Sequence, residues 1–184
     1  EKAADGNEYI PFKPIVGVEA YCARRGRLSH DKDYKEIGRD GKQMVVDASG
    51  WHLILLAKNS VGYHNLCRLV SFSFFEDSFY RTPRIDKELL EQYHDGIICS
   101  SACLGGEISQ KIIHGDIEGA RQAVKWFHDL FGSDYYIEIQ RHETQKPGGD
   151  PTTYEQQKRV NPVLIQLARE NGVKVICTND VHFV

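Results

Sequence analysis

Asp180 and His182 are the residues whose types and spacing most directly suggest chemistry. They follow a short run of apolar, mostly β-branched residues (173–177), bounded by Gly172, which is typical of an inner strand of a parallel sheet. Polar groups just past the carboxyl end of such a strand lie where α/β sheets and barrels place their chemistry. Residues two apart on an extended segment point to the same side. A carboxylate and an imidazole there can share a divalent metal ion, although a helix cap and a stray histidine explain the same residues.

Glu19 and Cys103 are two further candidate metal ligands. Glu19 interrupts a strand rich in Ile and Val (13–21), where a carboxylate is unfavourable unless it is paired, bound to a metal, or turned to solvent on an edge strand. Cys103 lies in a small-residue loop (102–107) that follows a third strand (96–101) and begins a helix. Helix N-termini lower the pKa of a thiol, so Cys103 is expected to be a thiolate or a metal ligand.

Two histidines lie beside predicted strands. His52 stands at the start of the strand at 51–57, and a lone histidine in such a place is more often structural than a ligand. His142 comes just past the strand at 135–140 and is a second-tier site candidate. Neither residue identifies a metal site by itself.

Composition describes an ordinary globular chain. The 184 residues are 41% hydrophobic and 27% charged with a net charge of −3, so the chain as a whole has no basic footprint for nucleic acid. No apolar run approaches the roughly 18 residues needed to cross a bilayer, and the polar leader (1–11) is no signal peptide. The five cysteines form no CxxC pair, which favours a reducing, cytoplasmic setting over a disulfide framework.

The predicted elements alternate between strands and helices, which implies one α/β domain (12–184) built on a mostly parallel sheet. Between the first two strands, residues 22–50 predict a β-hairpin-like excursion, with Asp40-Gly41 as its turn and charges that fit a solvated face. The aromatic and arginine residues of 71–84 fit a core and its rim, or a surface that stacks on nucleic-acid bases.

Five motifs occur together in one order. They are residues 14–21 (PIVGVEAY), 51–59 (WHLILLAKN), 100–107 (SSACLGGE), 136–142 (YIEIQRH) and 178–183 (TNDVHF). This set resembles the C-terminal portion of the polymerase-and-histidinol-phosphatase (PHP) domain of the bacterial replicative DNA polymerase III alpha subunit. The resemblance extends over residues 12–184, and it depends on the order and spacing of motifs that are individually weak.

The resemblance implies a distorted seven-stranded, TIM-like α/β barrel with up to three metals at one end. By motif position it places five residues among the metal ligands: Glu19, His52, Cys103, Asp180 and His182. His142 is expected near the site. His52 fits this set least comfortably, because it lies near the start of its strand. Zinc, manganese or magnesium is the implied metal, and the sulfur ligand suits the first two better than magnesium alone.

The sequence departs from the family at its beginning, where the His-x-His and Thr-Asp-His motifs of PHP domains do not occur. The expectation is therefore a partial barrel that lacks its first strands and about half of the ligands. Such a fragment would be catalytically inactive, and its exposed strand edges would favour self-association.

The function implied for the intact domain is metal-dependent phosphoester hydrolysis, most simply 3′–5′ exonuclease proofreading within a replicative DNA polymerase. The implied partners are DNA, reached through the parent polymerase, and the other replicase subunits, with no membrane. Two alternatives stay open: a structural domain that stabilises the polymerase and its partner subunits, and a stand-alone PHP phosphatase that acts on a small phosphate ester.

Overall fold

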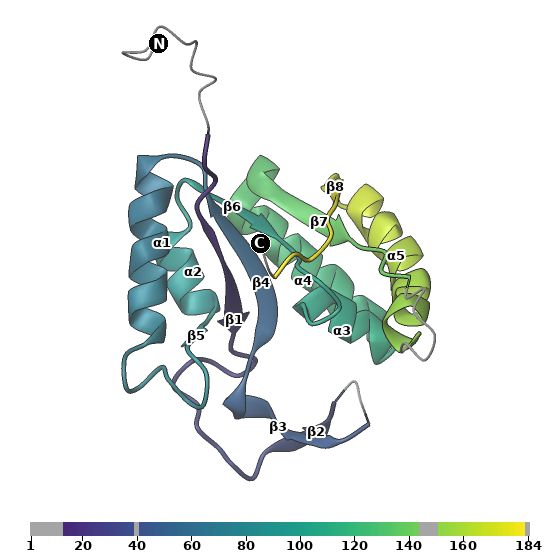
Figure 1. Ribbon diagram of the computed structural model, residues 1–184, viewed down its shortest axis with the longest axis horizontal. Helices are drawn as coiled ribbons and strands as arrows, with labels where there is room; N and C mark the ends of the chain where they lie inside the picture. The colour runs from purple at the N-terminus through teal and green to yellow at the C-terminus, as the bar shows by residue number, and fades with distance from the viewer. Residues whose placement is uncertain (1–12, 39–40, 144–150, 183–184) are drawn as a thin grey trace, which may run out of the picture.

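The computed structural model describes residues 13–38, 41–143 and 151–182, so the predicted polar leader (1–11) lies outside it. The described part is a mixed α/β fold with one six-stranded sheet, one two-stranded sheet and helices packed against the larger sheet (Figure 1). In chain order the elements are β1 (Gly17–Cys22), β2 (Lys35–Ile37), β3 (Gln43–Val45), η1 (Val46–Ala48), β4 (Trp51–Ala57), α1 (Ser60–Ser73), β5 (Arg84–Ile85), α2 (Lys87–Tyr93), β6 (Ile97–Ser100), α3 (Glu107–Ile113), α4 (Ile117–Phe131), η2 (Gly132–Asp134), β7 (Tyr135–Ile139), α5 (Thr152–Glu170) and β8 (Lys174–Cys177).

The large sheet has the strand order β5-β1-β4-β6-β7-β8. Three of its pairings are parallel (β1 with β5, β6 with β7, β7 with β8), and β4 is antiparallel to both of its neighbours. Five strands therefore run in one direction and β4 runs in the other. This confirms an α/β fold with a mostly parallel sheet, but β5 and β8 remain unjoined among the described residues, so the closed barrel is not part of what the structure shows.

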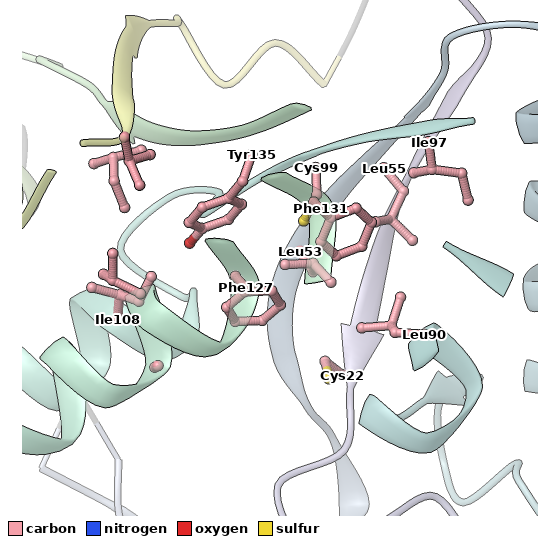
Figure 2. Packing of buried hydrophobic residues seen from close by; sticks show 14 of the residues in the cluster. Cys22, Leu53, Leu55, Leu90, Ile97, Cys99, Ile108, Phe127, Phe131 and Tyr135 are labelled. Carbon is pink, nitrogen blue, oxygen red and sulfur yellow. The ribbon is translucent and has the colours of Figure 1, made fainter. Parts of the chain in front are cut away.

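Helices bury one face of this sheet. α1 packs against β4 and β6, α4 against β6 and β7, and α5 against β7 and β8 (Figure 1). The core alternates along each strand, as in β4, where Leu53 and Leu55 are buried. At its centre the rings of Phe127 and Tyr135 stack with their centroids 5.3 Å apart (Figure 2). The other face carries partly exposed side chains of β4, β6 and β8, which line an open groove of about 490 Å³.

Local sequence signals explain where the helices begin. The side chains of Asn59, Asp86 and Asp116 each accept a hydrogen bond from a backbone N–H of the first turn of α1, α2 and α4, respectively. α5 continues through Pro162 as one helix, so the proline neither ends it nor starts a second segment. Gly172, at a φ of 66°, ends this helix and leads into β8.

The excursion at 22–50 contains a two-stranded antiparallel ribbon, β2 with β3, that projects from the end of the large sheet (Figure 1). Arg84 on β5, whose side chain is fully buried, connects this excursion to the domain. Arg84 donates to the carbonyl oxygens of Arg27 (2.6 Å), Ser29 (3.1 Å) and Asp47 (2.6 Å). Its Nε donates to the carbonyl oxygen of Ser78 at 3.2 Å, and burial lowers its pKa.

The contacts of Asp47 and Arg84 correct two expectations from the sequence. Asp47 does not belong to a solvated face, because it is 2% exposed, accepts a hydrogen bond from the Asp31 N–H at 2.9 Å and lies 3.4 Å from Arg25. Arg84 cannot stack on nucleic-acid bases, because its guanidinium is enclosed by backbone carbonyls. Sequence alone does not reveal which arginine of an aromatic segment turns inward.

Replacing Arg84 by Met should lower the free energy of unfolding by about 3 kcal/mol or more, since four buried or partly buried carbonyls lose their donor and the buried carboxylates lose a counter-charge. Denaturant unfolding followed by circular dichroism measures this. Arg159→Met, at an exposed position of α5, is the control and should change the stability by less than about 0.5 kcal/mol. Equal effects of the two substitutions would contradict the role of Arg84.

Buried thiols should report the integrity of the core. Burial raises the pKa of Cys22 to about 12, so this thiol stays protonated in the folded chain, whereas an unfolded thiol ionises near pH 9. Its contribution to stability is complete below about pH 9 and is lost as the pH rises towards 12. With iodoacetamide at about pH 8, the exposed Cys67 and Cys177 should be alkylated in the folded chain, and Cys22 and Cys99 only on unfolding. Peptide mass spectrometry distinguishes them, and equal rates at all four would contradict the packing.

Candidate metal centre

The candidate site lies at one edge of the large sheet, and the reversed direction of β4 brings His52 to it. Ile54 of β4 is opposite Glu19 of β1 on one side and Ser100 of β6 on the other. The first residues of β4 are therefore level with the ends of β1 and β6. This explains how His52 can lie at the site although it stands near the start of its strand: the start of β4 coincides with the carboxyl ends of the neighbouring strands.

The first group of potential ligands is Glu19, His52 and Cys103, whose ligand atoms all lie within 4.8 Å of one another. Glu19 and His52 are a diagonal pair on adjacent antiparallel strands, and the Glu19 carboxylate contacts the His52 Nδ1. The Cys103 Sγ lies 3.5 Å from the same nitrogen. A carboxylate oxygen, an imidazole nitrogen and a sulfur thus converge at one point.

The second group is Glu19, Asp180 and His182, again with ligand atoms within 4.8 Å of one another. The segment after β8 turns back across the sheet and brings these two C-terminal residues to β1 (Figure 1). The His182 Nδ1 donates to the Asp180 carbonyl oxygen at 2.8 Å, which leaves Nε2, 3.6 Å from the Glu19 Oε2, as the unprotonated ligand atom of the neutral ring. Glu19 belongs to both groups, with one oxygen towards each histidine.

The electrostatics of this edge favour a bound cation. Burial, together with the charges of Asp180 and Glu19, raises the pKa of the Cys103 thiol to about 11. The expectation that the helix N-terminus lowers this pKa is therefore wrong, because desolvation and two carboxylates outweigh the N–H donors. The hydrogen bond to Asp180 and the charges of Asp180 and Glu19 raise the pKa of His182. These raised pKa values favour the protonated thiol and imidazole. A bound divalent cation would instead favour the deprotonated forms and would convert the thiol to a thiolate.

The loops that carry the ligands have specialised backbone. Among the described residues, Ala102 and Asp180 are two of the three non-glycine residues with positive φ, at 58° and 51°. Such conformations are uncommon outside glycine and cluster at functional sites. A Cβ on Gly105 would lie 2.9 Å from the His52 ring, and one on Gly106 would lie 2.1 Å from the Ser101 carbonyl oxygen. Both glycines are therefore required for the Cys103 loop to approach β4.

His142 lies beside these groups but in neither of them. Its Nε2 donates to the Asn179 carbonyl oxygen at 3.0 Å, and its Nδ1 accepts from the Gln157 amide at 2.9 Å. It shares a cleft of about 420 Å³ with His52, Cys103 and Asp180. Because both ring nitrogens have protein partners, the structure gives His142 a position near the site, holding the residue before Asp180.

Glu138 is a buried carboxylate that sequence reasoning did not select. It is 5% exposed and accepts hydrogen bonds from Ser100 (2.5 Å), Gln140 (2.8 Å) and Thr178. These contacts join the ends of β6, β7 and β8, which carry the Cys103 loop, His142 and the Asp180 segment. A carboxylate between two isoleucines in a strand was the available signal for this role.

The geometry defines an α/β domain with clustered carboxylate, imidazole and thiol groups at one sheet edge, and comparison with known proteins identifies its class. The sequence pattern of the PHP domain matches residues 1–142, so this chain belongs to the PHP domain family.

Several relatives of this chain are named DNA polymerase III subunit alpha. The chain is 41% identical to that of Borreliella burgdorferi, 41% identical to that of Deinococcus radiodurans and 40% identical to that of Thermus aquaticus, over 94%, 95% and 94% of its own length. It spans 13%, 12% and 12% of these relatives, respectively. The resemblance seen in the five sequence motifs is thereby confirmed. In the described part of the chain, no helix combines the length and apolarity that a membrane crossing requires.

Replacing Glu138 by Leu should lower the free energy of unfolding by about 2–4 kcal/mol, because it leaves buried hydroxyl and amide donors without an acceptor. Glu138→Gln should lower the free energy of unfolding by less, because the amide keeps an acceptor oxygen. Urea unfolding with matched m-values measures both changes. Glu155→Leu, at an exposed position on α5, is the control. A Glu138→Leu effect no larger than that of Glu155→Leu would contradict the role of the buried carboxylate.

Proposed function

We propose that this chain is part of the PHP domain of a replicative DNA polymerase, and that the domain hydrolyses phosphodiester bonds with bound divalent metals as a 3′–5′ proofreading exonuclease. The observation that carries the proposal is the pair of ligand groups that share Glu19 at one sheet edge. The names of the relatives support the polymerase, and the chemistry of the cluster supports the hydrolysis.

Each candidate ligand would have its own role in binding the two metal ions. Glu19 presents one oxygen towards His52 and the other towards His182, so it would contribute to the binding of both ions. Cys103 and His52 would hold one ion, and Asp180 and His182 the other. Sulfur among the ligands favours zinc or manganese over magnesium alone. Bound ions would lower the pKa of a water molecule and clamp the phosphate oxygens in line.

The open face of the sheet supports a site that further chain completes. The groove of about 490 Å³ exposes Ile54, Leu56 and Ile98 next to Glu19 and Asp180. The chain also spans only 12–14% of its relatives. We propose that additional strands of a distorted seven-stranded barrel cover this face and add ligands, with DNA and other replicase subunits as partners in the cytoplasm.

Because Glu19 would serve both ions, neither ion has three ligands of its own within the described residues. We therefore expect this chain alone to hydrolyse DNA slowly or not at all. A metal-dependent nuclease rate that Asp180→Ala abolishes would contradict this expectation.

Metal content is the direct test of the centre. After equilibration with zinc or manganese and removal of free ions, elemental analysis should find metal in the chain and markedly less in Asp180→Ala and His52→Ala. His64→Ala, at an exposed histidine on α1, is the control and should retain the metal. An ion present at about 100 times its dissociation constant should also raise the free energy of unfolding by about 2.7 kcal/mol.

Two outcomes would count against the catalytic proposal. Equal metal contents in Asp180→Ala and His64→Ala would show that Asp180 does not bind the metal and would contradict the proposed site. Metal that stabilises the full-length polymerase without supporting any exonuclease activity would favour the alternative, in which the domain serves as a scaffold for the polymerase and its subunits.

A further inference from the structure

A second hollow, of about 430 Å³, adjoins the cleft of the candidate metal centre. Arg24 and Gln110 line both the hollow and the cleft, so they form the boundary between the two. Trp51 and Lys111 line the hollow, whereas His52 lines the cleft. Trp51 and His52 are consecutive in β4 and point to opposite faces. The two spaces therefore meet around the start of this strand.

The guanidinium of Arg24 does not use all of its hydrogen-bond donors within the described part of the chain. Its Nη1 donates to Glu36 at 3.1 Å, whereas its Nη2 has the Met44 sulfur, a weak acceptor, at 3.9 Å. Its buried Nε has no hydrogen-bond partner in the described part of the chain. Among the described residues that line the cleft, Arg24 is the one with a permanent positive charge. Because the Nε is enclosed by protein, Nη2 is the donor of this guanidinium that a phosphate in the cleft can use.

Two cationic side chains lie near the ring of Trp51. The Arg24 Cζ lies 5.4 Å from the ring centroid and the Lys111 Nζ lies 5.7 Å from it. The ring is only half-buried, and the Lys111 ammonium, which is 3.5 Å from Asp116, remains partly exposed. Half-buried aromatic rings flanked by basic side chains are the elements with which proteins bind single-stranded nucleic acid.

We infer that a single-stranded phosphodiester chain leaves the metal centre past Arg24 and enters the hollow of Trp51 and Lys111. Arg24 binds a phosphate, Trp51 stacks on a base and Lys111 binds the next phosphate. A hollow of 430 Å³ is within the size range of small-ligand sites and accepts a nucleotide. This inference rests on the proposed function and deepens it, because it selects a polymeric substrate over a small phosphate ester.

Fluorescence anisotropy of labelled oligothymidylates tests it on the 184-residue chain with zinc or manganese present. An eight-nucleotide probe should bind more tightly than a two-nucleotide probe. Lys111→Gln should weaken binding of the longer probe about three- to ten-fold and lower its salt dependence by about one ion, while the shorter probe is unaffected. Lys125→Gln, an exposed lysine of α4 paired with Asp129, is the matched control. Arg24→Gln should weaken both probes.

A second measurement reports the stacking directly. In a Trp126→Phe background Trp51 is the remaining tryptophan, since the chain has two, and the eight-nucleotide probe should quench its fluorescence. Equal effects of Lys111→Gln and Lys125→Gln, no gain of affinity with length, or no quenching would each overturn the inference.

Metal content measured on the same samples separates the two proposals. Bound metal without dependence on Lys111 overturns only the strand site. Absence of metal overturns the proposed centre, and the comparison of Lys111→Gln with Lys125→Gln still decides whether the strand binds here.

Discussion

The antiparallel direction of β4 is the constraint on which the candidate site depends. Had β4 run parallel to β1 and β6, His52 would lie at the opposite edge of the sheet, far from Cys103 and Asp180. The long excursion at 22–50 makes the reversal possible, because it returns the chain to the edge at which β1 ends. Arg84 fixes that excursion through carbonyl oxygens of three segments, so a buried cation far from the ligands helps to set the position of His52.

Acidic and sulfur groups are concentrated at one edge of the sheet, and their environment raises the pKa values of Cys103 and His182. Two residues of the same loops, Ala102 and Asp180, adopt left-handed backbone. Glu138 adds a further buried carboxylate, which hydroxyl and amide donors from three strand ends compensate. Rigid strands beneath strained loops are how a fold holds ligands ready before an ion arrives.

Much of this organisation was predictable, for reasons that are local. The strand at 51–57 has five consecutive apolar residues after His52, and it has the expected bounds. Asn59 is a good helix cap, and α1 begins directly after it. The motifs also selected five residues whose side chains lie in two groups at one edge of the sheet: Glu19, His52, Cys103, Asp180 and His182. The direction of β4, the burial of Arg84 and Asp47, and the high pKa of Cys103 were not predictable, because each depends on contacts between segments far apart in the sequence.

Charge links the candidate metal centre to its substrate. The chain carries a net charge of −3, and Glu19, Asp180 and a Cys103 thiolate would add a concentrated negative potential at the site where a phosphate must approach. Arg24 alone offsets little of this potential within the cleft. Two divalent ions would invert it, so under the proposed function metal binding and DNA binding must favour each other, and by linkage the nucleic acid must tighten the binding of the ions. The second hollow has balanced charges, because Arg24 pairs with Glu36 and Lys111 with Asp116, and all four residues line it. A strand bound there would therefore meet less negative potential than at Glu19 and Asp180.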